Sequence, residues 1–226
     1  MQKIIGVDTV ISTERYSDSY FKIIKPVLDY FVATVLLLIT SPLFLIFCIS
    51  IKLHSPGPIF FTQERIGKNG KPFRIIKFRS MRVNADTNLH KEYMQRVIQT
   101  NISPAELGKK SLKLDAADPR ITHVGKILRS SGLDELPQLI NVLKGEMSIV
   151  GPRPPIPYEV ELYEAWHKQR LAVLPGITGL WQVTAHNLVP FNEMVRIDID
   201  YILKANLWLD LKIMLLTPIE MLRKKG

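Results

Sequence analysis

The chain has 226 residues, a hydrophobic content of 46% and a formal net charge of +9 at pH 7. This length accommodates one modest globular domain with a membrane segment, or one larger soluble domain. The basic charge favours anionic partners, which are nucleic acid, an anionic membrane face or phosphorylated small molecules. The single cysteine, Cys48, excludes an intrachain disulfide, and the five histidines show no metal-ligand spacing, so no zinc site is expected.

An uncharged apolar segment, Tyr30–Ile51, dominates the N-terminal part of the sequence. As a helix it would extend about 33 Å at about 1.5 Å per residue, which is enough to cross the hydrocarbon core of a bilayer. The segment therefore predicts membrane attachment, and a single transmembrane helix with domains on both faces is the simplest form of it.

Two features favour a segment that enters and leaves the bilayer by the same face. Ser41-Pro42 lies at its middle, and an internal proline bends a helix because it removes a hydrogen bond and clashes with the preceding turn. Basic residues, which are typical of cytoplasmic flanks, occur on both sides of the segment: Lys22, Lys25, Lys52, Arg65, Lys68 and Lys71. We therefore expect an N-terminal segment (1–24), a re-entrant helix-break-helix (25–53) and a cytoplasmic domain (54–226).

The region after the membrane segment begins with a predicted β-hairpin. Ile59–Ile66 and Pro72–Phe78 are rich in strand-forming residues, and Asn69-Gly70 between them is a strong hairpin signal. Residues 84–117 are polar and locally helical, and we interpret them as a connecting insertion without recognisable chemistry.

The C-terminal half is predicted to be mostly helical. The predicted helices are Val124–Arg129, Asp134–Leu143 with Gly145 as its stop, Tyr158–Leu174, Val189–Leu203 and Leu207–Leu222. Pro175–Gly179 is predicted as a turn and Leu180–Thr184 as a short strand. The last helix carries Trp208 and precedes a basic end, which is typical of an interfacial helix, although an ordinary core-packing helix fits equally well. The expected fold class is α+β, mostly helical, with a small β-hairpin and amphipathic interfacial helices.

The pair Asp134-Glu135 is the most suggestive of chemistry. Acidic residues in the first turn of a helix are favoured by the macrodipole, so a purely structural role is one interpretation. In the other interpretation, one carboxylate attacks an electrophile while its neighbour binds a cation or moves a proton. A helix N-terminus would also present backbone N–H groups to a phosphate, so the two interpretations are compatible.

Many basic side chains accompany this pair: Lys77, Arg79, Arg120, Lys126, Arg129 and Arg153. Phosphoryl transfer depends mainly on positioning and charge neutralisation, so these residues suit it, although scattered basic residues are equally typical of a solvated face. Gly151-Pro-Arg-Pro-Pro155 is more specific, because rigid neighbours, Pro152 among them, would hold the Arg153 guanidinium in place for bidentate phosphate recognition. Any metal is expected to be a hard cation that bridges carboxylate and phosphate oxygens, such as Mg²⁺.

Seven motifs in order resemble the bacterial sugar transferase family, the monotopic phosphoglycosyl transferases. They cover residues 22 to about 222. The motifs are Lys25-Pro-x-x-Asp29, Ser41-Pro42, Ser55-Pro-Gly-Pro-Ile-Phe-Phe-x-Gln-Glu-Arg-Ile-Gly67, Lys77-Phe-Arg-Ser-Met81, Leu133-Asp-Glu-Leu-Pro-Gln138, Met147-Ser-Ile-Val-Gly-Pro-Arg-Pro154 and Pro175-Gly-Ile-Thr-Gly179. One such motif alone would be a weak signal, whereas the ordered series is specific.

The resemblance implies an enzyme that takes a sugar 1-phosphate from a UDP-sugar, transfers it to undecaprenyl phosphate and releases UMP. It implies Asp134 as the nucleophile of a covalent phosphosugar intermediate and Glu135 as a Mg²⁺ ligand. The expected substrate-binding residues are Arg129, Arg153, Pro152, Lys77, Arg79 and Arg120. By the same resemblance, Ser41-Pro42 matches the break in a re-entrant membrane helix.

The implied location is the cytoplasmic face of a bacterial inner membrane, at the first membrane step of exopolysaccharide, capsule, O-antigen or glycoprotein glycan assembly. The expected partners are the two substrates and membrane lipids, with a homodimer left open and no nucleic acid. Glucose or galactose is the expected sugar. Ala185-His186 stands where many relatives have a Gly-Arg pair, which leaves the sugar contacts at these positions open.

Two further expectations concern the alternatives. Larger family members carry a multi-helix membrane domain before this region, so a compact catalytic-core form is expected here. A non-catalytic, membrane-tethered protein that binds anionic lipid or nucleic acid is the competing hypothesis. It explains the charge and the apolar segment, but not why Asp134-Glu135 and Arg153 occur together.

Overall fold

The computed structural model describes residues 19–83, 88–103, 105–106, 118–185 and 188–223. Most of the predicted N-terminal segment (1–24) and part of the insertion (84–117) therefore lie outside the described residues. Within the described part the protein is mostly helical, with two small sheets, as the fold-class prediction expects.

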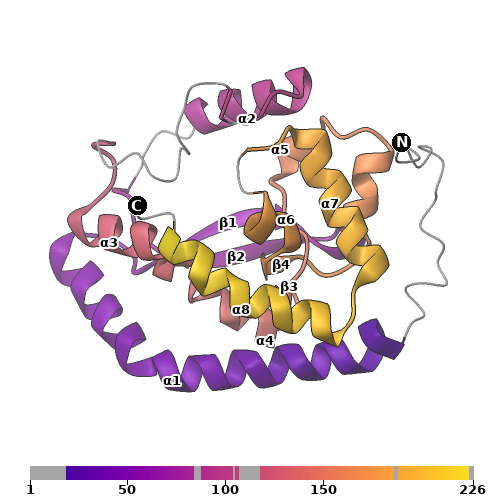
Figure 1. Ribbon diagram of the computed structural model, residues 1–226. Helices are drawn as coiled ribbons and strands as arrows, with labels where there is room; N and C mark the ends of the chain where they lie inside the picture. Colours follow the sequence, from indigo (N-terminus) through magenta and orange to yellow (C-terminus); the bar gives the residue numbers. More distant parts are fainter. Residues whose placement is uncertain (1–18, 84–87, 104, 107–117, 186–187, 224–226) are drawn as a thin grey trace.

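The N-terminal apolar segment is one long helix. The π-helical turn η2 (Tyr20–Ile24) continues directly into α1 (Lys25–His54). Together they are long and apolar enough, by length and composition, to cross a membrane. Figure 1 shows that α1 runs along one side of the molecule and then turns towards α3 (His123–Ser131) in its second half.

The predicted break at Ser41-Pro42 is instead a bend inside a continuous helix, because a side chain replaces the missing backbone bond. Pro42 has no N–H to offer to the carbonyl of Leu38, four residues earlier. The Ser41 hydroxyl donates to that same carbonyl at 2.8 Å. In an apolar environment the Ser41 hydrogen bond is important, because no water is present there to bond to the free carbonyl of Leu38.

The predicted hairpin is confirmed. β1 (Phe60–Ile66) and β2 (Pro72–Phe78) pair as antiparallel strands, with Phe60 opposite Phe78. The connection includes the short turn η3 (Lys68–Gly70), in which Asn69 has a φ of 57°. Asparagine tolerates this left-handed conformation better than most residues, which is why the Asn-Gly signal was informative.

A second, parallel sheet was not predicted. β3 (Ser148–Val150) pairs with β4 (Gly176–Thr178), so the segment Pro175–Gly179 contains a strand and the prediction of a simple turn was wrong. The two strands approach very closely, since a Cβ on Gly176 would lie 2.1 Å from the backbone nitrogen of Gly151. Glycine at this position therefore lets the start of β4 lie close against Gly151, which follows β3.

The remaining predicted elements are corrected in their type or bounds. Leu180–Thr184 is the helix α6, not a strand, because the N–H groups of Gln182 and Val183 bond back to the carbonyl of Gly179. The long helix predicted over Tyr158–Leu174 is divided into two short elements. The described helices after β2 are α2 (Asn88–Thr100), α3, η4 (Leu133–Glu135), α4 (Gln138–Leu143), α5 (Pro157–Val160), η5 (Trp166–Ala172), α6, α7 (Phe191–Lys204) and α8 (Leu207–Arg223).

The N-terminal end of α1 is fixed to the rest of the protein by a buried group of charged and hydroxyl side chains, which we call the anchor network. Its members are Tyr20, Lys25, Asp29, Tyr201 and Asp210. Lys25 Nζ lies 2.6 Å from Asp210 Oδ2, and the Tyr20 hydroxyl donates to the same oxygen at 2.5 Å. Asp29 Oδ1 accepts from the backbone N–H of Ile149 at 3.0 Å. The network therefore ties α1 to α8 and to β3.

The C-terminal end of α1 is fixed by aromatic packing. Phe47 and Ile51 lie in one buried cluster with Phe78 of β2 and Leu128 of α3. The ring centroids of Phe44 and Phe78 are 4.7 Å apart. Both ends of α1 are therefore held by the same globular body.

Candidate active site

The pair Asp134-Glu135 lies in a tight turn between two helices, not at the start of a single long helix as predicted. Gly132 ends α3 in the left-handed conformation, with a φ of 71°, and reverses the chain into η4. α4 begins after Pro137. This turn separates the two acids: Asp134 is only 4% exposed, whereas Glu135 lines a pocket.

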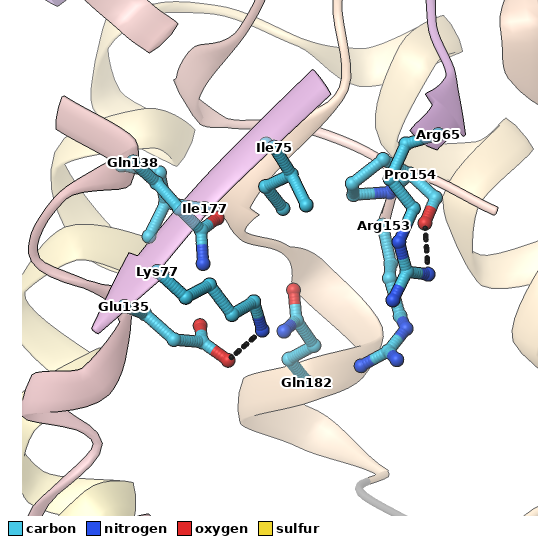
Figure 2. A pocket seen from close by; sticks show the side chains of 10 residues that line it. Arg65, Ile75, Lys77, Glu135, Gln138, Arg153, Pro154, Ile177 and Gln182 are labelled. Atoms are coloured by element: carbon cyan, nitrogen blue, oxygen red, sulfur yellow. Dashed lines mark hydrogen bonds and ion pairs between the residues drawn. The ribbon is translucent and has the colours of Figure 1, made fainter. Parts of the chain in front are cut away.

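Glu135 forms an ion pair at one side of the pocket. Lys77 Nζ, from β2, lies 3.0 Å from Glu135 Oε1, and each side chain is about one fifth exposed. Figure 2 shows this pair beside Gln138, with Arg65, Arg153 and Pro154 opposite and Gln182 between the two groups. The pocket is lined by Arg65, Ile75, Lys77, Glu135, Gln138, Arg153, Pro154, Gly176, Ile177 and Gln182. Three basic side chains thus face the pocket against one carboxylate, so its charge suits a multiply charged anion.

The loop that carries Arg153 is held through its carbonyl groups. The segment Gly151–Pro155 contains three prolines, which have no N–H to donate. The carbonyls of residues 152–155 all accept hydrogen bonds instead. The donors are Gly176 N to Pro152 (2.8 Å), Arg170 Nη2 to Arg153 (3.4 Å), Arg65 Nη1 to Pro154 (3.0 Å) and Ile66 N to Pro155 (2.9 Å). We call this segment the Arg153 loop.

Arg65 is a pocket residue that the sequence analysis treated only as a basic flank of the membrane segment. Its side chain is 6% exposed, and its Nη2 donates to Gln63 Oε1 at 2.9 Å. Burial, together with the neighbouring charge of Arg153, lowers the pKa of the Arg65 guanidinium to about 10. Arg65 is the one buried position of β1, and the sequence of the strand gives no alternation that would have indicated it.

Two other predicted arginines lie in or just before α3: Arg129 within the helix and Arg120 in the chain that precedes it. Burial lowers the pKa of Arg129, while the carboxylates of Asp134 and Asp118 act in the opposite direction. Arg120 grips Asp118 through two nitrogens, with Nε–Oδ1 at 2.9 Å and Nη2–Oδ2 at 2.7 Å. Neither Arg129 nor Arg120 lines the pocket, although the charge of Asp134 acts on Arg129.

The other predicted residues within the described chain do not line the pocket. The Arg79 guanidinium donates to the carbonyls of Ser55 and Pro56, at 2.7 and 2.8 Å, and so ties the end of α1 to β2. Pro152 is buried and contributes its carbonyl to the Arg153 loop. Ser41 and Pro42 are exposed at the bend of α1. His186 lies outside the described residues.

A metal ion would have few protein ligands here. Among the described residues, no group of three or more His, Cys, Asp and Glu side chains could hold one. Glu135 is the one carboxylate in the described pocket lining, and Asp134 precedes it in the chain. This donor set fits Mg²⁺, which binds through one or two carboxylates and takes its other oxygens from substrate phosphates and water.

Comparison with known proteins gives a consistent result. The family model described as bacterial sugar transferase matches residues 20–224. The chain is 42% identical over 211 residues to galactosyl transferase CpsE of Streptococcus agalactiae, covering 91% of this chain and 44% of that protein. It is 40% identical over 189 residues to the exopolysaccharide production protein ExoY of Rhizobium meliloti, covering 84% and 81%. It is 35% identical over 225 residues to the UDP-glucose:undecaprenyl-phosphate glucose-1-phosphate transferase of Escherichia coli K12, covering 96% and 44%. The chain therefore spans less than half the length of two of these three relatives.

Proposed function

The chain belongs to the bacterial sugar transferase family, and on this premise we propose that it transfers a sugar 1-phosphate from a UDP-sugar to undecaprenyl phosphate and releases UMP. The observation that carries the proposal is the pocket itself, which Lys77, Arg65 and Arg153 line together with Glu135, the residue that follows the buried Asp134 in the chain. The names of three relatives, from Xanthomonas campestris, Escherichia coli and Salmonella typhimurium, describe transfer of glucose or galactose phosphate to undecaprenyl phosphate. These names support glucose or galactose as the sugar.

In the proposed first step, an Asp134 carboxylate oxygen attacks the sugar-linked phosphorus of the donor. The bond from this phosphorus to the bridging oxygen breaks, and UMP leaves with the electron pair. The product is a sugar phosphate bound to Asp134 as an acyl phosphate. The basic lining of the pocket supports this step, because Arg65, Lys77 and Arg153 would neutralise charge on the diphosphate.

In the second step, a phosphate oxygen of undecaprenyl phosphate attacks the same phosphorus. The bond to Asp134 breaks, the carboxylate is restored, and the lipid diphosphate sugar is released. When bound, Mg²⁺ would supply positive charge to the transferring phosphate, and Glu135 would hold it. Lys77, which pairs with Glu135 and lines the same pocket, would rotate from Glu135 to contact the phosphate.

We propose further that α1 lies re-entrantly in the cytoplasmic face of the inner membrane. Both ends of α1 contact the same globular body, at Asp210 and at Phe78, which suits a helix that returns to its side of entry. Its exposed residues are largely apolar, and on α8 Trp208 is 79% exposed and Leu215 71% exposed. These surfaces support contact of α1 and α8 with lipid. Labelling of cysteines introduced near residues 15 and 60 tests the topology, and access from opposite sides would refute it.

The decisive experiment replaces the nucleophile. Asp134→Asn should abolish both UMP release from UDP-glucose or UDP-galactose and the covalent phosphosugar adduct seen by mass spectrometry. The matched control is Asp200→Asn on the surface of α7, where Asp200 pairs with Lys204. Near-normal UMP release by Asp134→Asn would refute the nucleophile assignment. If the wild-type protein released no UMP from any UDP-sugar but bound anionic lipid in a salt-dependent way, a membrane-tethered binding protein would replace the transferase.

A further inference from the structure

A buried ion pair lies directly behind the Arg153 loop. Arg170, in η5, is 6% exposed, and its Nη2 pairs with Oδ2 of Asp198 from α7, which is 1% exposed. The same Nη2 donates to the Arg153 carbonyl at 3.4 Å, and Nη1 donates to the Tyr163 hydroxyl at 3.0 Å. We call Arg170, Asp198, Tyr163 and the adjacent buried Glu159 the loop network.

The members of the loop network do not line the pocket. Arg170 and Asp198 can therefore affect a bound ligand only through residues that they contact. The pocket residue that Arg170 contacts is Arg153. Arg65 grips the next carbonyl of the loop, that of Pro154, at 3.0 Å. Two buried guanidinium groups thus hold consecutive carbonyls, and these bonds fix the peptide from which the Arg153 side chain leaves.

The buried charges of the loop network are unfavourable for stability. Burying an arginine and an aspartate costs free energy that an apolar pair of similar volume would not. Among the described residues, Arg170 Nε and Asp198 Oδ1 have no hydrogen-bond partner. Stability alone therefore gives no reason for the pair, whereas holding a carbonyl that carries the pocket arginine does.

We propose that Arg170, held by Asp198, is a positioning residue that fixes the Arg153 guanidinium for the diphosphate of the donor. The inference rests on the proposed binding of a UDP-sugar and adds the side chains that orient its phosphate contact. If the backbone of Arg153 moves, its guanidinium is no longer held at a fixed position relative to the phosphate. Such misplacement weakens phosphate binding and transfer.

The test is a double-mutant cycle of Arg170→Met and Arg153→Met. The readouts are the KM for UDP-sugar in UMP release and the Kd of UDP by calorimetry. With Arg153 present, Arg170→Met should raise both constants about tenfold and change kcat less, a coupling of ordinary size for residues in contact. In the Arg153→Met background, Arg170→Met should change them by less than about twofold.

A matched pair of aspartates on α7 provides the second arm. Asp198→Asn should raise the same KM, while Asp200→Asn, two residues away and paired with Lys204 at the surface, should leave it unchanged. If Arg170→Met fails to fold, Arg170→Lys and Asp198→Asn carry the same comparison in the two Arg153 backgrounds.

The outcomes separate the two proposals. If UMP is released but the effects of Arg170 and Arg153 substitutions are additive, the positioning role is overturned and the transferase stands. If Asp198→Asn and Asp200→Asn behave alike, the positioning role is again overturned. If the wild type neither binds UDP nor releases UMP, the proposed function fails and the inference fails with it.

Discussion

Two buried charged networks differ in how completely their polar atoms are bonded. In the anchor network, Asp210 is fully buried, and both of its oxygens are satisfied: Oδ1 accepts from the Tyr201 hydroxyl at 2.8 Å, and Oδ2 from Tyr20 and Lys25. In the loop network, Asp198 Oδ1, Arg170 Nε and Glu159 Oε1 have no hydrogen-bond partner among the described residues.

The difference separates a structural role from a functional one. A buried carboxylate with all its donors present stabilises the arrangement around it, and here it holds α1 against α8. A buried polar atom left without a partner costs free energy. The incompletely bonded network is the one that lies behind the pocket, so the protein gives up stability where it positions Arg153.

The largest expected effect is on the anchor network. Asp210→Asn would leave the Lys25 ammonium buried without its closest carboxylate, which lies 2.6 Å away, and should lower the free energy of unfolding by about 3–5 kcal/mol. Urea unfolding in detergent measures this loss. The control Asp200→Asn should stay within about 0.5 kcal/mol of the wild type, as expected for a surface change. A loss below about 1 kcal/mol for Asp210→Asn would contradict the structural role of the network.

Two matched hydroxyl deletions sharpen the comparison with smaller effects. Tyr201→Phe removes a hydroxyl that donates to Asp210 Oδ1 and to the Val150 carbonyl. It should lower the free energy of unfolding by about 1–3 kcal/mol without changing the KM for UDP-sugar. Tyr163→Phe removes the hydroxyl that accepts from Arg170 Nη1. It should lower the free energy of unfolding by about 1 kcal/mol and raise the KM for UDP-sugar. Unfolding curves and UMP-release kinetics on both variants make the check. If Tyr201→Phe and Tyr163→Phe changed the KM for UDP-sugar equally, the assignment of different roles to the two networks would be wrong.

The smallest expected effect is a dependence of stability on pH through His167, which lies in η5 with Arg170 of the loop network. Burial lowers the pKa of His167, whose Nδ1 accepts from the backbone N–H of Glu164 at 3.0 Å. The unfolded chain therefore binds a proton at higher pH than the folded protein does. The stabilising contribution of neutral His167 is complete above the ordinary histidine pKa of about 6.5 and is lost as pH falls through the lowered value.

The measurement is thermal unfolding between pH 7.5 and pH 5 for the wild type and His167→Gln. The wild type should lose slightly more stability on acidification than His167→Gln, which cannot take up the proton. Parallel pH profiles for the two proteins would exclude His167 as a source of acid sensitivity.

Local signals allowed much of the fold to be predicted. Asn69-Gly70 specified the hairpin, because its conformations match a tight turn between strands. Gly145 was predicted to stop a helix, and it has a φ of 71° just after α4. These features depend on a few neighbouring residues, so the sequence alone contains the needed information.

Long-range contacts decided what the sequence could not predict. Leu180–Thr184 has the composition of a strand, but the N–H groups of Gln182 and Val183 bond to the Gly179 carbonyl, and Trp181 and Val183 enter two different buried clusters, as residues on opposite sides of a helix do. The strand Gly176–Thr178 forms only because β3, far away in the chain, provides its partner. A parallel pair of this kind has no local sequence signal.

The candidate site divides in the same way. Asp134, Glu135, Lys77 and Arg153 were found from motifs, and the last three line one pocket while Asp134 is buried beside Glu135 in the chain. Arg65 and Arg170 were not predicted, because their importance comes from the carbonyls that they reach across the fold. Lining residues Gln138 and Gln182 also had no assigned role, since an amide in a helix has no distinctive spacing.

The attachment of α1 at both ends has a consequence for how substrates are found. A helix tied at Asp210 and at Phe78 cannot swing away from the body that holds the pocket. In the proposed membrane arrangement the pocket travels at a fixed height while the enzyme diffuses laterally. The lipid acceptor would then be encountered by a two-dimensional search, whereas the nucleotide sugar arrives by three-dimensional diffusion. The two encounters are independent in time, which suits a reaction that stores the sugar phosphate on the enzyme between them.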